Sequence, residues 1–494
     1  MPQTTSGTDS AVRATTPPRR WFVLASLAAS VSLIVIDGTI VNVALPTIIA
    51  DLHLIGSQAE WVTSIYSLIF AALLIPIGKL ADTYGRRRFL LGGLSIFVIA
   101  SLLAGFATSP ALLITARAFQ GIGGAAVLPT TLSTVNATFR GPDRAIAFAV
   151  WGSVMSGMAA IGPLLGGWIA TYATWHWIFF INIPLGVIIG IATIFTVPET
   201  LDPPEDPRLD PVGIILAAIA CGGLVFGLIE GQSHGWFQPT AHHFDSTWPL
   251  SVAAIALLAG MIALGAFIFT QSMRGKRSLP TTLDLQLFTH RSFSWGNLAA
   301  FSIATGEFGL IFTLPLFMQI SLGMTPIASG WILATMAAGA FLAGGLAAPF
   351  ARRTHPATVA TTGLALEVVG VGLLACFISP SMHVVALMIP LVIYGIGLGL
   401  ASAQLTSTVL VDVPSAQSGQ ASATQSTTRQ LGSALGIAIV GSALFALTHY
   451  FASTNPLQPE MNPQSLAQAA PYALWIANGF LVSGLLATLK LPRR

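Results

Sequence analysis

Residues 21–45 read WFVLASLAASVSLIVIDGTIVNVAL, a run of 25 residues that contains one charged side chain, Asp37. A helix needs about 20 mostly apolar residues to span the hydrocarbon core of a bilayer, so this run is long enough to cross a membrane. Comparable runs recur at 59–79, 89–107, 111–135, 145–170, 177–197, 211–231, 248–270, 292–319, 327–350, 357–378, 383–411, 421–450 and 470–490. The sequence therefore predicts an all-α polytopic membrane protein with about fourteen transmembrane helices.

The composition supports this fold class. Of the 494 residues, 54% are hydrophobic and 8% are charged, whereas soluble domains carry about 25% charged residues. So few charges cannot cover a soluble body of this size, which excludes a cytosolic enzyme, a secreted domain and a nucleic-acid binder. Cys221 and Cys376 both lie in apolar runs, so they indicate neither a disulfide framework nor a metal site.

The positions of Lys and Arg predict the orientation. If the N-terminus is placed in the cytoplasm, every loop cluster of these residues falls on the cytoplasmic side, as the positive-inside rule requires. The opposite loops 232–247 and 451–469 contain no Lys or Arg. We therefore expect a multi-pass protein of the plasma (inner) membrane with both termini in the cytoplasm. The clusters include Arg19 and Arg20, Arg86 to Arg88, Arg274 to Arg277, and Lys490 to Arg494.

The spans are predicted to form two six-helix halves with an inserted pair of helices between them. Pro46 near the end of the first helix has a counterpart in Pro315 of the ninth, as expected of an internal repeat. The inserted pair carries no deep charge, so we expect it outside the two halves and away from a central cavity. The expected parts are a disordered N-terminus (1–20), the first bundle (21–198), a cytoplasmic linker (199–210), two accessory helices (211–270), a cytoplasmic loop (271–291), the second bundle (292–490) and a tail (491–494).

Five ordered motifs resemble those of a known family. Residues 78–88, GKLADTYGRRR, are similar to the loop motif of the major facilitator superfamily. Residues 36–46, IDGTIVNVALP, resemble the helix 1 signature of its fourteen-helix drug:proton antiporters of the EmrB/QacA type. Segments 113–124, 157–167 and 429–436 resemble the helix 4, helix 5 and helix 13 motifs. His176 departs from the pattern, because the family usually has Arg there.

The resemblance implies the major facilitator fold and a secondary active transporter. Its expected activity is proton-coupled antiport that exports hydrophobic or cationic drugs, as in multidrug efflux and antibiotic resistance. The expected partners are small hydrophobic or cationic substrates, protons and membrane lipids, with no nucleic acid. No nucleotide-binding loop of the Gly-x4-Gly-Lys-Ser/Thr type occurs. We therefore expect no cofactor, with the proton gradient as the driving force.

Ionisable side chains inside the spans are the candidates for coupling and substrate binding, because insertion of Asp at a helix centre costs about 2.5–3.5 kcal/mol. Asp37, Arg117 and Glu307 are the candidates for proton coupling. Asp37, Glu307 and Glu367 are the candidates for lining the substrate cavity. The alternatives are a helix-end acid at Asp37, a structural arginine at Arg117 and carboxyls hydrogen-bonded between helices at the two glutamates.

Helix 1 carries a polar stripe. Ser26, Ser30 and Asp37 project within about 40° of one another on a helical wheel, which predicts that they face a cavity rather than lipid. Because removal of a charge from the membrane relieves its burial cost, the variant Asp37→Asn is expected to be at least as stable as the parent protein.

Two glycine-containing motifs carry further candidates. The first is predicted to be a conformational latch on the cytoplasmic face and consists of Gly78, Asp82, Gly85 and Arg86. The second is the antiporter motif Gly157, Gly162, Pro163, Gly166 and Gly167. For the second motif, a kinked packing helix and a leak-preventing antiporter element both fit the residues.

Other functions remain possible alternatives. One is a dedicated exporter of a single metabolite or lipid. Another is a lipid-handling or sensor protein without proton coupling. A membrane-embedded enzyme would need a nucleophile, a metal cluster or a catalytic loop, and the longest loops carry none, so we expect no enzyme.

His234, His242 and His243 are expected to be loop residues rather than a metal site. The sequence indicates no oligomeric state.

Overall fold

A computed structural model of the chain describes residues 17–139, 142–201, 210–237, 250–277, 279–379, 382, 384–409, 411–413, 418–453 and 462–492. These ranges are overwhelmingly helical and contain no β-strand. The α-helices are α1 (Pro17–Leu52), α2 (Gly56–Tyr84), α3 (Arg86–Gly105), α4 (Pro110–Thr138), α5 (Pro142–Tyr172), α6 (Trp177–Phe180), α7 (Asn182–Thr196), α8 (Pro211–His234), α9 (Val252–Lys276), α10 (Arg291–Leu316), α11 (Pro326–Arg353), α12 (Pro356–Phe377), α13 (Val384–Val409), α14 (Ser418–Ser453) and α15 (Pro463–Thr488). A 3-10 turn, η1 (Leu285–Thr289), precedes α10, and a π turn, η2 (Phe317–Ser321), follows it.

The described helices confirm the expected fold class. Thirteen segments are long and apolar enough to cross a membrane, with α6 and α7 forming one interrupted segment. Helix α5, of 31 residues, is a further long helix that packs against α1 and α11. Fourteen alternating crossings bring the start of α1 and the end of α15 to one side, here called the terminal face. The opposite side, which holds the short connection His53–Ile55, is called the far face.

The boundaries differ from the expected ones in two places. Residues 17–20, expected to be disordered, form the first turn of α1, because Pro17 and Pro18 suit the first turn of a helix. Residues 271–276, expected in a loop, extend α9, and residues 285–289 form η1. Residues 1–16, most of the expected linker (202–209) and residues 493–494 lie outside the described ranges.

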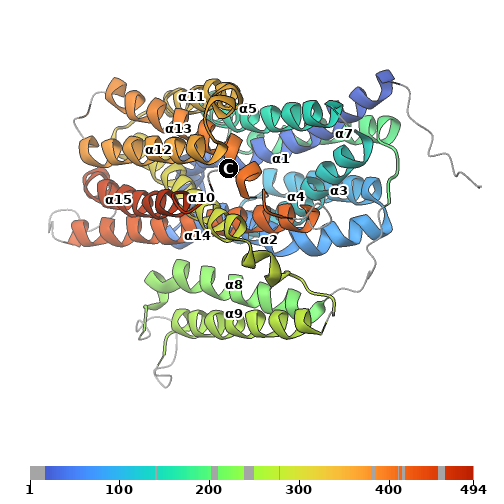
Figure 1. The fold of residues 1–494 in the computed structure, drawn as a ribbon. Coiled ribbons are helices and arrows are strands. Elements are labelled where there is room, and N and C mark those ends of the chain that lie inside the picture. The colour runs from blue at the N-terminus through green and yellow to red at the C-terminus, as the bar shows by residue number, and fades with distance from the viewer. Residues whose placement is uncertain are drawn as a thin grey trace, which may run out of the picture.

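Two groups of helices pack side by side (Figure 1). Helices α1 to α7 pack mainly with one another, and α10 to α15 do the same. The two groups meet through α2 against α14 and through α5 against α11.

The two groups are packed together near the far face. One hydrophobic cluster joins residues of both groups there, including Ile40 and Val43 of α1, Phe312 and Leu316 of α10, and Phe445 of α14. Two other large clusters lie toward the terminal face. One consists of residues of α1 to α7, with Ala423 of α14 packed at its edge, and the other consists of residues of the second group. The far face is therefore closed, and the groups separate toward the terminal face.

Hydrogen bonds across the far face support this arrangement. Gln319 Nε2 donates to the carbonyl of Val43 at 2.8 Å, and the Ile327 amide donates to Thr171 Oγ1 at 2.9 Å. Each bond joins a residue of one group to a residue of the other, so opening of the far face must break both.

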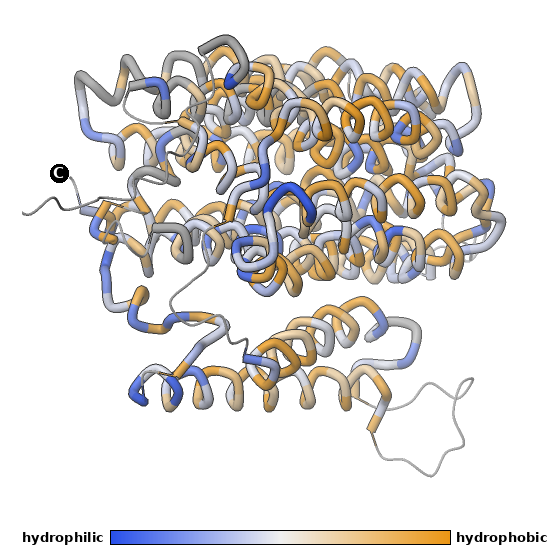
Figure 2. The backbone as a smooth tube through the Cα atoms, turned by 90° about the vertical axis from the view of Figure 1, so that its right-hand side faces the viewer, coloured by the Kyte–Doolittle hydropathy of each residue, from blue (hydrophilic) through white to orange (hydrophobic). Residues whose placement is uncertain are grey.

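Helices α8 and α9 form a hairpin beneath the main body (Figure 1), and this hairpin is largely hydrophobic along its length (Figure 2). Helix α8 packs against α2 and α14, with Val225 and Ile229 next to Leu68, Ala434 and Ala438. Helix α9 packs on α8. The inserted pair therefore lies outside the two groups, and α8 covers the line along which α2 meets α14.

Candidate functional site

An enclosed ion pair joins α1 and α4. Arg117 Nη1 donates to Asp37 Oδ2 at 2.5 Å, and the two side chains are 1% and 0% exposed. Enclosing two charges in a low-dielectric interior is costly unless they neutralise each other and all their hydrogen bonds are made. The packing therefore brings two of the predicted coupling residues into direct contact.

Polar side chains from two further helices complete the surroundings of Asp37. Gln120 Nε2 and Asn182 Nδ2 donate to Asp37 Oδ1 at 2.9 and 2.8 Å. Both amides also donate to Ser101 Oγ, at 2.8 and 3.3 Å. The sequence did not indicate Ser101 on α3 or Asn182 on α7, because no spacing in the chain relates them to Asp37. A carboxylate with three donors is held in one fixed position.

Arg117 is held equally firmly against α2. Its Nε donates to the carbonyl of Val62 at 3.2 Å, and its guanidinium carbon lies 4.6 Å from the centre of the Tyr66 ring. This approach depends on Gly121, because a Cβ there would lie 2.7 Å from the backbone oxygen of Tyr66. Gly121 therefore lets α2 and α4 approach closely enough to enclose the guanidinium.

The polar stripe of α1 does not face a cavity in this structure. Ser26 Oγ lies 2.9 Å from Thr196 Oγ1 of α7, and Ser30 Oγ donates to the carbonyl of Ser26. Asp37 is fully enclosed. The wheel correctly placed the three residues on one side of the helix, but that side is covered by other helices.

A looser charged pair lies in the second group of helices. Arg429 Nη2 of α14 lies 3.9 Å from Glu307 Oε2 of α10. The side chain of Glu307 is 13% exposed and that of Arg429 is 44% exposed. A long, partly exposed ion pair contributes about 0–1 kcal/mol. Arginine exposed this far within a membrane-spanning helix would be costly against lipid, and Arg429 instead borders an opening that is continuous with solvent.

Glu367 of α12 is more deeply enclosed than Glu307. It is 0% exposed, and neither of its carboxyl oxygens has a hydrogen-bond partner within the described ranges. The hydroxyl of Tyr394 on α13 is likewise without one. Glu367 therefore does not line a cavity in this conformation, in contrast to the expectation for it.

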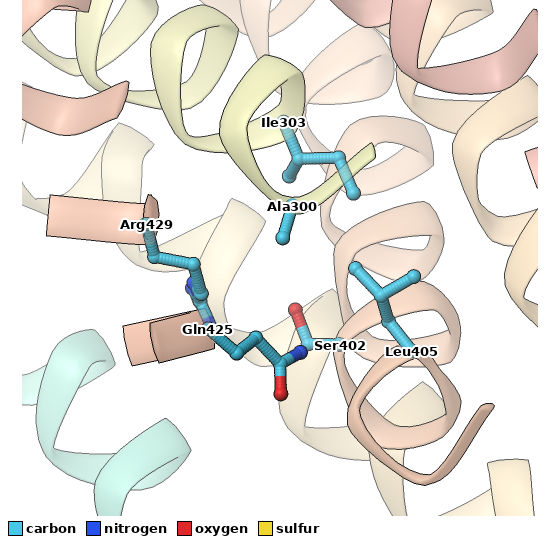
Figure 3. Close-up of a pocket in the computed structure, with 6 residues that line it drawn as sticks. All are labelled: Ala300, Ile303, Ser402, Leu405, Gln425 and Arg429. Atoms are coloured by element: carbon cyan, nitrogen blue, oxygen red, sulfur yellow. The ribbon is translucent and has the colours of Figure 1, made fainter. Parts of the chain in front are cut away.

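A pocket opens next to Arg429 (Figure 3). Residues from α10, α13 and α14 converge on it, and its space of about 250 Å³ includes open solvent. Ile303, on its wall, lies one helical turn before Glu307, so the pocket and the carboxyl occupy the same side of α10. The lining residues are Ala300, Ile303, Ser402, Leu405, Gln425 and Arg429. The pocket is a shallow opening beside Arg429 and is smaller than the pockets that hold drug-sized ligands.

The predicted latch residues come together at the α2–α3 turn. Arg86 Nε donates to Asp82 Oδ1 at 2.7 Å. Gly85 has a φ of +122°, and a Cβ there would lie 2.8 Å from Glu199 Oε1. Glu199 also accepts from the amide of Arg87 at 3.0 Å. Glu199, expected to belong to the linker, is therefore part of the latch.

The remaining contacts of this motif join α2 to α4 and to the end of α7. Gly78 lies against Pro129 of α4, and Arg86 Nη1 donates to the carbonyl of Ser133 at 3.4 Å. The Arg86 amide donates to the carbonyl of Thr200 at 3.2 Å. These contacts all lie within the first group of helices, on the terminal face.

We expect Asp82→Asn and Gly85→Val to slow transport about tenfold while the substrate dissociation constant stays within about twofold. Asp82→Asn removes the charge that pairs with Arg86, and Gly85→Val forces a side chain into a positive-φ position, at a cost of about 1–3 kcal/mol. Turnover and equilibrium binding are measured on the same reconstituted protein. Thr83→Ala is the control, because Thr83 Oγ1 donates to the carbonyl oxygen of Lys79 within its own helix. Normal turnover with lost binding would contradict a latch.

The glycines of the antiporter motif lie where α5 meets two other helices. Gly162 packs against Thr39, and a Cβ at Gly166 would lie 2.6 Å from the carbonyl oxygen of Ile40, both on α1. A Cβ at Gly167 would lie 2.6 Å from the carbonyl oxygen of Pro326 on α11. Pro163 and Gly157 lie on the same helix. The motif therefore packs α5 against its own group and against the other group at once.

The described residues contain no cluster of three or more His, Cys, Asp or Glu side chains that could hold a metal ion. His234 lies at the end of α8, with Nδ1 3.3 Å from Glu230 Oε2. His242 and His243 lie outside the described ranges.

Comparisons with known proteins agree with this fold of two packed helical halves and identify a class of membrane transporters. The Major Facilitator Superfamily description matches residues 27–437. The multidrug efflux pump LfrA of Mycolicibacterium smegmatis is 34% identical over 94% of this chain and 88% of its own length. The puromycin resistance protein pur8 of Streptomyces alboniger is 30% identical over 94% of this chain and 90% of its own length. The chain belongs to the major facilitator superfamily, which confirms the resemblance seen in the motifs.

Solved structures show the same fold at low sequence identity. A bacterial homologue of the human lysosomal transporter Spinster, in an inward-facing unoccupied conformation, aligns with a TM-score of 0.66 at 19% identity. The alignment covers 96% of this chain and 98% of that one. An auto-inhibited peptide transporter of the POT family aligns with a TM-score of 0.68 at 16% identity, over 96% of each chain.

Proposed function

We propose that the protein exports hydrophobic, often cationic small molecules in exchange for protons by alternating access. The observation that carries the proposal is a carboxyl next to an arginine in each half, at the depth of the membrane. Asp37 and Glu307 lie on α1 and α10, the first helix of each half, and contact Arg117 and Arg429. Buried ionisable groups are expensive in a membrane and mark ion and substrate pathways.

The two centres differ in a way that suits two roles. Asp37 is enclosed and held by three donors, so a change in its protonation must rearrange the packing of four helices. Glu307 is loosely paired, partly exposed and next to the pocket, so a cationic substrate can replace Arg429 beside it. We assign proton coupling to Asp37 with Arg117, and substrate binding together with coupling to Glu307.

The names of the relatives support small-molecule export, since they describe a multidrug efflux pump and a puromycin resistance protein. Transport rather than catalysis is the proposed activity, with no cofactor and with the proton gradient as the energy source. A pH difference of one unit supplies about 1.4 kcal/mol per proton, and 100 mV adds about 2.3 kcal/mol per charge. Together these sustain roughly a 500-fold gradient of a neutral solute per proton.

The proposed orientation follows from the positive-inside pattern. Arg20, Arg86 and Lys490 lie on the terminal face, so this face is assigned to the cytoplasm of a plasma (inner) membrane. Because the far face is closed, the conformation is then open to the cytoplasm, the side from which an exporter takes up its substrate.

Purified protein in liposomes tests the proposal. An imposed proton gradient should drive accumulation of dye-like cations, and adding substrate should release protons in the same vesicles. A sensor or lipid-handling protein would give no proton flux. A dedicated exporter would give flux with a single compound from a panel of cations, neutral drugs and lipids.

We expect Glu307→Gln to weaken the binding of monovalent cationic substrates about tenfold and to leave neutral substrates within about twofold. The change removes a negative charge and leaves Arg429 uncompensated beside the pocket, so a bound cation loses its partner and meets an unopposed like charge. Binding constants for cation and neutral pairs of similar size measure the effect. Asp284→Asn is the control, because it removes a carboxylate outside the spans and keeps the cap of η1. An equal loss for both classes would show that Glu307 does not recognise charge.

A further inference from the structure

Glu60 is a buried carboxyl at a junction of three parts of the protein. It lies in the second turn of α2 and is 1% exposed. Ser442 Oγ of α14 is 2.9 Å from Glu60 Oε2 and 2.9 Å from the carbonyl oxygen of Leu228 on α8. One hydroxyl therefore joins the first half, the second half and the inserted hairpin near the far face. Glu60 lies at the edge of the predicted span 59–79 and was not among the candidates chosen from the sequence.

The surrounding packing leaves room for this carboxyl and no more. A Cβ at Gly441 of α14 would lie 3.0 Å from Glu60 Cγ and 3.0 Å from Phe312. Next to Glu60, Trp61 Nε1 donates to Glu230 Oε1 of α8 at 2.8 Å. The junction is thus closed by a glycine on one side and by a tryptophan–carboxylate bond on the other.

The number of protons at the junction decides the state of Glu60. A serine hydroxyl has one proton to donate and can accept from other donors, whereas a carbonyl oxygen can only accept. If Ser442 donates to Leu228, the bond to Glu60 requires a proton on the carboxyl. An ionised Glu60 would compete with the Leu228 carbonyl for the single proton, and the link from α14 to α8 would then be lost.

We propose that Glu60 is a proton-binding site of the far-face gate: its protonated carboxyl, through Ser442 and the Leu228 carbonyl, holds α2, α14 and α8 together. The inference rests on the alternating access of the proposed function. When α2 and α14 separate, water reaches Glu60 and the carboxyl ionises. Its proton comes from, and returns to, the water on the far side. Glu60 therefore ties closure of the gate to the pH on that side and does not carry the proton across.

One charged side chain adjoins the junction from α8. Glu230 accepts from Trp61, the residue after Glu60, and its Oε2 lies 3.3 Å from His234 Nδ1 on the same helix. From α10 and α14, Phe312 and Ser442 adjoin the junction and carry no charge. They offer no cation to an enclosed, ionised Glu60, and burying an unpaired charge is costly. Helix α8 thereby acquires a part in gating although it lies outside the two halves.

The distance between the ends of α2 and α14 on the far face tests the proposal. Spin labels are placed at Ile55 and Tyr450, both exposed, in full-length protein with Cys221 and Cys376 replaced. We expect the parent protein in lipid nanodiscs to shift to longer distances as the pH is raised. Glu60→Gln should keep the short distance at every pH, with an open fraction about tenfold smaller at high pH, because the amide donates to Ser442 but cannot ionise.

Two further variants keep the result decisive. Glu230→Gln, the matched control, removes a carboxylate from the same junction and leaves Glu60 in place, so it should still open as the pH is raised. Ser442→Ala should open at lower pH than the parent, because the link from α2 to α8 is lost, and it tests the junction even if Glu60→Gln fails to fold.

The outcomes separate this inference from the proposed function. A Glu60→Gln titration with the amplitude and midpoint of the parent would overturn the inference, as would a parent whose distance does not respond to pH. If opening depends on Glu60 but the protein shows no proton-driven export in liposomes, the proposed function is overturned. The inference about Glu60 then still stands.

Discussion

The free energy of unfolding of Asp37→Asn is expected to be about 3–5 kcal/mol lower than that of the parent protein. The variant is also expected to lose export against a gradient. Asparagine cannot neutralise Arg117, which is 1% exposed, and removal of one partner of a buried ion pair leaves the other charge uncompensated. The sequence led to the opposite expectation for stability, because the charge at position 37 was considered without its partner. The two effects are measured by unfolding in detergent and by proton release with substrate uptake in liposomes.

The matched control is the double variant Asp37→Asn with Arg117→Gln. It removes both charges, so most of the stability should return, while the proton coupling should stay lost. Downhill exchange of a neutral substrate should survive in the double variant, since alternating access itself requires no proton. Concentrative export by Asp37→Asn with the pH dependence of the parent would show that Asp37 is structural and that the coupling proton binds elsewhere, at Glu307 or Glu367.

Gly167→Val is expected to prevent full closure of the far face and to lower transport at least about tenfold. The new side chain would meet the backbone oxygen of Pro326 at 2.6 Å, and a Cβ at Gly330 would meet the carbonyl oxygen of Pro163 at 2.7 Å. Backbone cannot move aside as a flexible side chain can, and overpacking typically costs about 1–3 kcal/mol. The closed state alone bears this cost, so the population shifts toward a far face that is open.

Spin labels at Tyr172 on α5 and Trp331 on α11, both exposed, report this shift as a longer distance. Gly190→Val on α7 is the control, because a Cβ there meets nothing within 4 Å. The control should keep the distance and the transport of the parent. A Gly167→Val variant with unchanged distance would show that the α5–α11 contact is not part of the gate, and the motif would then be a packing element within the first half.

The sequence by itself determined the fold class and the general positions of the crossings. Residues 21–45 hold one charge, and Lys and Arg cluster in alternate connections, because lipid excludes charge and the membrane potential and insertion machinery sort basic loops. These constraints act on each segment separately, so they can be read without knowledge of the packing. Local geometry was readable for the same reason: Gly85 lies in a turn with positive φ, and Asp82 pairs with Arg86 four residues later.

Only the tertiary structure decided which side chains meet. A helical wheel shows which face of α1 holds Asp37, but not that Asn182, 145 residues away, completes its hydrogen bonds. Glu60 and Ser442 lie 382 residues apart and are brought together because α2 and α14 close one face of the bundle. The cost of burying a charge depends on its partner, which explains why the stability expected of Asp37→Asn changed sign. Thirteen of the described segments are apolar enough to cross a membrane alone, so only the packing decides whether a polar side chain meets lipid, water or a partner.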